Sequence, residues 1–176
     1  VQVVAILTSI AFAGVIFVVL GLILFGGGGE TVADQELSDA RALVEERPRD
    51  PAAWERLAAA QAAPGIDRFD EAIASAERAV ALDPRDYRLL QTLISLQIRE
   101  GRTDDAIAAL QSFTAGSPRN AEAFLQLGQL AEEAGRTPLA RLSYQAFLRL
   151  APDDRSADEV RDRLAGLGGA GVTTAP

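Results

Sequence analysis

The sequence has no histidine, no cysteine and no methionine. The absence of histidine removes the side chain that most often serves as a general acid or base near neutral pH. Without cysteine, the usual imidazole and thiolate ligands of a zinc site are both missing. A chain without cysteine forms no disulfide and is compatible with oxidising and reducing compartments alike. Asp and Glu are therefore the only abundant titratable groups left for acid–base catalysis.

The acidic residues do not form a convincing catalytic set. Two adjacent pairs, Asp104 with Asp105 and Asp153 with Asp154, stand at predicted helix starts, where acidic side chains interact favourably with the helix dipole. We therefore predict that the protein is not an enzyme and has no cofactor and no metal ion. The net charge of -8 also argues against a partner bound through phosphate groups, whether nucleic acid or anionic lipid.

Residues 1–25 form an apolar run without any charged side chain or proline. As a helix with a rise of about 1.5 Å per residue, the run would span about 37 Å, enough for a hydrocarbon core of about 30 Å. We therefore predict a transmembrane helix over 1–25. A cleaved signal peptide is the alternative, but its apolar region is usually about 7–15 residues long and follows a basic segment that this sequence does not show.

Small residues within this run are spaced as in interfaces between membrane helices. They are Ala5, Ser9, Ala13, Gly14 and Gly21. Because small side chains let two helices approach closely in lipid, we predict that this set binds another membrane helix. The alternative interpretation is that Ala and Gly are simply common in membrane spans.

Residues 26–33 are predicted to be a glycine-rich hinge, since four consecutive glycines lose too much backbone entropy to remain helical. The first basic residue after the apolar run is Arg41, and only acidic charges precede it. Cytoplasmic flanks of membrane helices are usually rich in Lys and Arg. We therefore predict a single-pass protein of the bacterial cytoplasmic membrane whose remaining chain lies outside the cytoplasm.

The rest of the sequence is repetitive. The sequence separation between Pro84 and Pro118 equals that between Pro118 and Pro152, and the separation between Pro48 and Pro84 is slightly longer. Other equivalent positions of the successive units, here called columns, also hold similar residues. Two columns near the start of each unit hold large side chains (Trp54, Leu90, Phe124 and Leu57, Leu93, Leu127), a middle column holds alanine (Ala72, Ala106, Ala140), and a later one holds Ala79, Phe113 and Phe147. A period of about 34 residues is typical of stacked helix hairpins. Gly101 and Gly135 are expected in the turns between paired helices.

These columns resemble the tetratricopeptide repeat (TPR) family over about residues 51–152, with a preceding half-repeat at 34–47. The resemblance implies an all-α fold, in which a TPR-type α-solenoid of about three helix hairpins occupies 34–165. We expect helices at 34–47, 52–63 with 68–82, 87–100 with 104–116, 121–134 with 138–150, and a capping helix near 157–165. The turn at 62–70 is enlarged by two residues, and 166–176 is predicted to be a flexible tail. Trp54, Leu57, Leu93, Leu127, Tyr144 and Phe147 should be largely buried.

In the TPR family, the first helices of successive units line a groove that receives a peptide or helix of a partner. Placed on this sequence, the groove columns give Glu55, Ala59, Arg88, Gln91, Ser95, Arg99, Glu122, Leu125, Gln129 and Glu132. The alternative interpretation is that these residues are only the solvated faces of amphipathic helices. Lys and Asn, with which some TPR proteins hold a terminal carboxylate, are absent from these positions.

The resemblance and the apolar run together predict a non-enzymatic scaffold or accessory subunit of a bacterial membrane complex, bound through its span and its groove. The alternative is a transient assembly factor outside the cytoplasm. One span followed by a TPR domain resembles the factors that present apocytochrome to the haem ligation machinery and the ancillary proteins of the secretory translocon. A subunit would be recovered at a fixed ratio with its complex, whereas an assembly factor would be substoichiometric.

Overall fold

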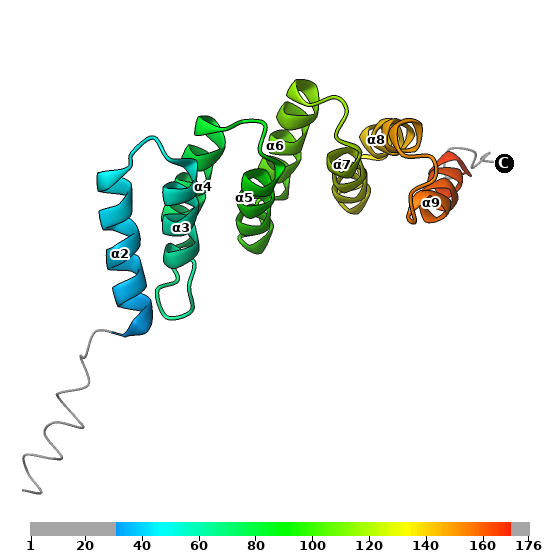
Figure 1. Cartoon of the computed structure of the whole chain (residues 1–176). Coiled ribbons are helices and arrows are strands. Elements are labelled where there is room, and N and C mark those ends of the chain that lie inside the picture. The colour runs from blue at the N-terminus through cyan, green and yellow to red at the C-terminus, as the bar shows by residue number, and fades with distance from the viewer. Residues whose placement is uncertain (1–30, 170–176) are drawn as a thin grey trace, which may run out of the picture.

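The computed structural model describes residues 31–169, which form eight α-helices and no strand (Figure 1). The helices are α2 (Val32–Glu46), α3 (Pro51–Gln61), α4 (Phe69–Leu82), α5 (Tyr87–Arg99), α6 (Thr103–Gly116), α7 (Ala121–Glu133), α8 (Thr137–Leu150) and α9 (Ala157–Gly169). The predicted all-α solenoid of paired helices is confirmed. Within the described range, no helix is long and apolar enough to cross a membrane.

Most helix ends lie within about two residues of the positions expected from the repeat. The exception is α9, which continues to Gly169 because Leu164 and Leu167 pack against the α8 side of the core. The predicted tail at 166–176 therefore starts too early. The transmembrane prediction at 1–25, most of the hinge and residues 170–176 lie outside the described residues, and α2 already includes the last two residues assigned to the hinge.

Two kinds of helix start alternate along the chain. The first helices of the hairpins, α3, α5 and α7, begin after Asp50, Asp86 and Asn120, whose side chains accept backbone N–H groups of the first turn. The second helices, α4, α6 and α8, have no side-chain cap of this kind. Gly101 and Gly135 have φ of +71° and +70°, which fits the predicted turns because glycine adopts positive φ without steric cost.

The core lies between the helices of each hairpin and between neighbouring hairpins. Figure 1 shows the helices side by side in one row, and every helix from α2 to α9 packs against the next one in the chain. The predicted alanine column is fully buried, since Ala72, Ala106 and Ala140 all have no exposed surface. Small side chains at these positions allow close helix contact, so the repeat register read from the sequence is correct.

Trp54 departs from the predicted core because it is only partly buried. Its indole Nε1 donates a hydrogen bond of 2.9 Å to the backbone oxygen of Pro48, and the guanidinium of Arg78 lies 6.0 Å from the ring centroid. The preceding half-repeat supplies a single helix, so the ring is covered on fewer sides than its counterpart Leu90, which is 1% exposed.

Gly128 and Tyr144 form an unusual pair in the third hairpin. A Cβ atom on Gly128 would lie 2.5 Å from two ring carbons of Tyr144, so only glycine leaves room for this ring. In the second hairpin the position equivalent to Gly128 holds Ile94 and the position equivalent to Tyr144 holds Leu110, and both are buried in one cluster. The third hairpin therefore has a glycine and an aromatic ring at the positions where the second hairpin has two aliphatic side chains.

A buried polar pair is complete in the first hairpin and incomplete in the second. Ser75 Oγ donates a hydrogen bond of 2.7 Å to Gln61 Oε1. Gln97 occupies the Gln61 column one unit later, but Ala109 stands where Ser75 would be. The Oε1 atom of Gln97 is consequently buried without a hydrogen-bond partner, which is costly for a polar group.

Ion pairs join the N-terminal ends of neighbouring second helices. Arg102 at the start of α6 pairs with Asp70 of α4, and Arg136 at the start of α8 pairs with Asp104 of α6 at 2.5 Å. The two pairs are separated by one repeat of the sequence. The next aspartate of this series is replaced by Pro138, so the series ends at α8. We call these two contacts the Arg–Asp ladder.

The enlarged turn after α3 contributes to packing. Ile66 is partly buried against the cluster of Leu37, Ala40, Leu57 and Ala60, which joins α2 to α3. The following Asp67 has a φ of 49°, the only positive value at a non-glycine residue in the described part of the chain. The two extra residues thus let the turn place an apolar side chain on the N-terminal end of the core.

Candidate binding face of the helical array

Exposed and half-buried side chains on α3, α5, α7 and α9 form what we call the first-helix face. Glu55 on α3 pairs with Arg88 on α5, and Thr92 Oγ1 donates a hydrogen bond of 3.2 Å to Glu55 Oε1. The Glu55 side chain is 20% exposed and that of Arg88 is 58% exposed. The structure therefore brings these two predicted residues together across the boundary between the first and second hairpins.

The next boundary, between α5 and α7, is also bridged by polar contacts. Gln91 Nε2 donates a hydrogen bond of 3.4 Å to Glu122 Oε1, and the Tyr87 hydroxyl donates one of 2.7 Å to Gln126 Oε1. Burial, and secondarily the negative charge of Glu122, raises the pKa of Tyr87 to about 12. Tyr87 is thus a neutral hydrogen-bond donor throughout the physiological pH range.

Glu132 lies at the centre of the third boundary, between α7 and α9. It accepts a hydrogen bond of 2.6 Å from the buried Tyr144 hydroxyl and one of 3.2 Å from Arg163 on α9, which also binds Glu159. Burial, followed by the Glu132 contact, raises the pKa of Tyr144. Polar contacts therefore connect α3, α5, α7 and α9 into one continuous surface.

The remaining predicted groove residues differ in how free their side chains are. Ser95 donates its hydroxyl to the Gln91 backbone oxygen at 2.8 Å, and Arg99 lies 4.2 Å from the ring centroid of Phe69. Leu125 is partly buried against the cluster around α8, and Gln129 is half-buried. Ala59 is exposed.

Sequence reasoning missed Ile98, which is 44% exposed on α5. It lies one repeat before Glu132 and so occupies the same column of the first-helix face. A large apolar residue in a column that holds glutamate in the next unit was the signal that could have identified it. The predicted small residues of the span, Ala5, Ser9, Ala13, Gly14 and Gly21, lie outside the described residues.

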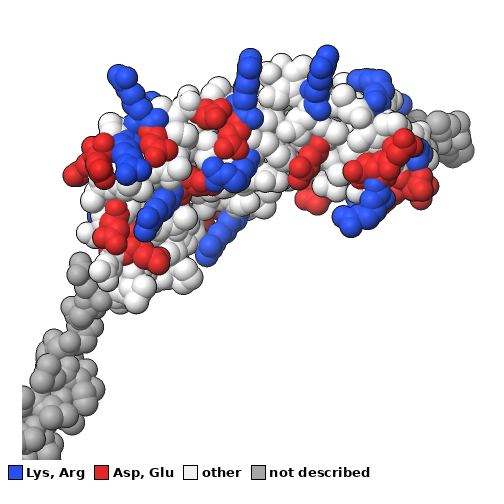
Figure 2. Space-filling view, viewed as in Figure 1, with Lys and Arg blue, Asp and Glu red and all other residues white. Residues whose placement is uncertain are grey.

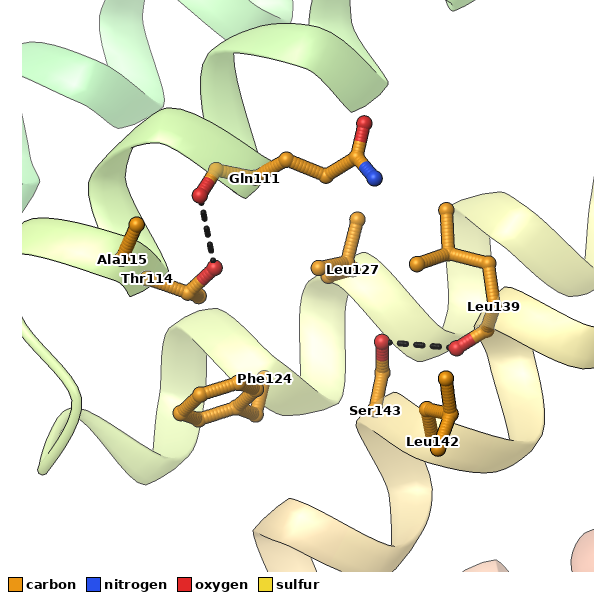
Figure 3. A pocket seen from close by; sticks show the side chains of 8 residues that line it. All are labelled: Gln111, Thr114, Ala115, Phe124, Leu127, Leu139, Leu142 and Ser143. Atoms are coloured by element: carbon orange, nitrogen blue, oxygen red, sulfur yellow. Dashed lines mark hydrogen bonds between the residues drawn. The ribbon is translucent and has the colours of Figure 1, made fainter.

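A separate apolar cleft lies between α6 and α8, with α7 as its floor (Figure 3). It has a volume of about 310 Å³ and is lined by Gln111, Thr114, Ala115, Phe124, Leu127, Leu139, Leu142 and Ser143. The Thr114 and Ser143 hydroxyls both donate to backbone oxygens of their own helices at 2.9 Å, so neither offers a free donor. Leu142 is 64% exposed, and its column holds alanine in the other two hairpins. The cleft was not predicted.

The acidic pairs named in the sequence have structural contacts. Asp104 lies in the first turn of α6 and pairs with Arg136, and Asp154 Oδ1 accepts a hydrogen bond of 2.8 Å from the backbone N–H of Ser156. Among the described residues, no group of three or more Asp or Glu side chains is placed to hold a metal ion. These contacts explain the positions of Asp104 and Asp154.

The fold and the repeat columns agree with comparisons to known proteins. Two tetratricopeptide repeat models match residues 92–155 and 67–115, so that together they cover 67–155, which is half of the chain. The chain belongs to the tetratricopeptide repeat family. Proteins of this family generally serve as scaffolds for protein–protein interaction. No curated protein matches this chain.

Three solved structures illustrate the likeness of fold. A crystal structure of MamA is 18% identical, with a TM-score of 0.59 over 81% of this chain and 86% of that chain. TTC0263, a TPR protein of Thermus thermophilus, is 23% identical, with a TM-score of 0.54 over 77% and 73%. The first TPR of Spaghetti (RPAP3), bound to the HSP90 peptide SRMEEVD, is 18% identical, with a TM-score of 0.54 over 71% and 95%. At these identities the likeness concerns the fold alone.

Proposed function

We propose that this TPR protein is a non-enzymatic scaffold that binds a peptide or helix of a partner protein on its first-helix face. The observation that carries the proposal is the continuous polar surface across α3, α5, α7 and α9, where side chains of successive units meet. Such a surface can hold an elongated segment through several modest contacts at once. The TPR of Spaghetti, which has the same fold, was solved with a bound peptide.

We further propose that residues 1–25 anchor the array in the bacterial cytoplasmic membrane and that the array lies outside the cytoplasm. The run is uncharged and long enough to span a bilayer, and its flank up to Arg41 carries only acidic charges. The small residues of the run would bind a neighbouring span. The protein would then be an accessory subunit of a membrane complex.

The two surfaces would reinforce each other. Once the span is bound, the hinge at 26–31 keeps the array close to the same complex at a high effective concentration, so that a weak contact on the first-helix face becomes occupied. A shortened chain that starts at Glu30 should consequently retain less of the partner than the full chain does. Equal retention would mean that the span is a membrane anchor only.

The deciding experiment is a pull-down in mild detergent with a variant of the first-helix face. The full chain carrying Gln91→Ala and Gln129→Ala should lose its partner, because both amides belong to this face. The matched control carries Gln35→Ala and Gln145→Ala, which remove two exposed amides from α2 and α8. If both variants retain the partner equally, binding lies elsewhere, for example in the α6–α8 cleft. A fixed ratio of protein to partner through repeated washes would identify a permanent subunit.

A further inference from the structure

The charges of the first-helix face are distributed unevenly along the array. Over α3 and α5 the face carries Glu55, Arg88 and Arg99. Over α7 and α9 it carries four glutamates, Glu122, Glu132, Glu133 and Glu159, against the single Arg163. Figure 2 shows a group of acidic side chains at the end of the array formed by the last helices, with basic side chains around it, and both signs interspersed over the first helices. The surface thus changes its charge along its length.

The change is a reversal of sign within two columns of the repeat. Glu122 lies one repeat after Arg88, and Glu133 lies one repeat after Arg99. In the second hairpin both columns are basic, and in the third hairpin both are acidic. Ordinary variation of a solvated surface would not require both columns to change sign together at neighbouring units.

Contacts within the array leave the acidic end uncompensated. Glu55 and Asp86 share the guanidinium of Arg88, and Glu132 and Glu159 share that of Arg163. Glu122 receives a hydrogen bond only from the neutral amide of Gln91. Glu133 is exposed and belongs to none of the ion pairs found among the described residues. Two carboxylates of the reversed columns therefore face solvent without a cation.

The middle turns of α5 and α7 on this face are uncharged. They carry Gln91, Ser95 and Gln129, and the exposed Ile98 follows next to Arg99 on α5. We propose that the occupant of the first-helix face is a basic amphipathic segment of a partner protein. Its Lys or Arg residues lie over Glu122 and Glu133, and its apolar side lies over Ile98. This proposal rests on the proposed function and adds the charge of the ligand and its orientation on the array.

The test uses the full chain in detergent and two synthetic helical peptides of one length with the same leucine pattern. One peptide carries lysine at its polar positions and the other carries glutamate there. The lysine peptide should bind at least about tenfold more tightly in fluorescence anisotropy at low ionic strength, and added salt should reduce this difference.

Three variants locate the effect. Glu122→Gln with Glu133→Gln should weaken binding of the lysine peptide, and Glu122→Arg with Glu133→Arg, which restores the signs of the second hairpin, should shift the preference toward the glutamate peptide. The control Glu45→Gln with Glu77→Gln makes the same change in net charge on α2 and α4, and should leave both affinities unchanged.

The proposal is overturned if the two peptides bind equally, if neither binds, or if the control variant weakens binding as much as the first. The pull-down with Gln91→Ala and Gln129→Ala separates this failure from that of the proposed function. If this variant loses the natural partner and the wild-type chain shows no preference between the two peptides, only the proposed charge of the ligand is refuted. Retention of the partner would refute the binding face itself.

Discussion

Replacement of Gly128 by alanine tests the packing of the third hairpin most directly. The new Cβ atom would lie 2.5 Å from Cδ1 and Cε1 of Tyr144, well inside van der Waals contact. The ring has little freedom to move away, since Tyr144 is 0% exposed and its hydroxyl is bound to Glu132 at 2.6 Å. Either the ring or the spacing between α7 and α8 must change to accommodate the methyl group.

The expected cost follows from two opposing effects. Overpacking of a well-packed core destabilises a protein by about 1–3 kcal/mol. Alanine is also a better helix former than glycine, which offsets this cost by up to about 1 kcal/mol in a helix interior. Gly166→Ala in α9 supplies the second effect alone, because a Cβ there would meet no neighbouring atom within 4 Å. The difference between the two variants should therefore be about 1–3 kcal/mol, the cost of overpacking alone.

The assay is urea unfolding of the full chain in detergent, followed by far-ultraviolet circular dichroism. A double-mutant cycle with Tyr144→Leu, which copies the Leu110 column, identifies the cause. In that background Gly128→Ala should stabilise the protein as Gly166→Ala does. If Gly128→Ala stabilises the otherwise natural chain, or if its effect is independent of Tyr144, then the assigned contact between α7 and α8 is wrong.

Four further predictions concern other parts of the chain. Ala109→Ser should raise the free energy of unfolding by about 0.5–1.5 kcal/mol, because its hydroxyl gives the buried Gln97 Oε1 a donor, and urea unfolding measures this. Asp67→Val should lower the free energy of unfolding by about 1–2 kcal/mol because φ is positive there, while the glycine variant should not. Folding raises the pKa of Tyr87 from 10.0 to about 12, so the contribution of this residue to stability is complete below pH 10 and is lost as the pH rises towards 12. The Tyr87→Phe variant should therefore lose less of its free energy of unfolding over this pH range, which alkaline unfolding measures. Thr174→Cys should react with an impermeant maleimide in intact cells if the array lies outside the cytoplasm, and reaction only after lysis would reverse the proposed orientation.

The helix pairs could be predicted from the sequence because prolines and small residues recur at fixed positions in each unit. Pro84, Pro118 and Pro152 locate the unit boundaries, and Ala106 and Ala140 locate the close contacts within each hairpin. Each of these residues acts through local geometry or through its own hairpin. A period in the sequence is sufficient to place such residues.

Features that depend on neighbouring units could not be predicted in the same way. The exposure of Trp54 depends on the preceding half-repeat, which covers only one side of the ring. The contact between Gly128 and Tyr144 involves two positions whose residues differ from unit to unit. Glu55 contacts Arg88 and Gln91 contacts Glu122 across the hairpin boundaries, and these pairings depend on how the hairpins stack. The predictions for residues 1–25 remain predictions.

The Arg–Asp ladder has a consequence for how the length of this protein can change. A duplicated segment 85–118 inserted after Pro118 would carry its own Arg102 and Asp104 equivalents, so that each new junction would again join a guanidinium to a carboxylate. A unit appended after α8 would find Pro138 where the carboxylate is needed. Longer natural or engineered versions should therefore have gained units in the interior of the array, with α9 kept as the invariant end.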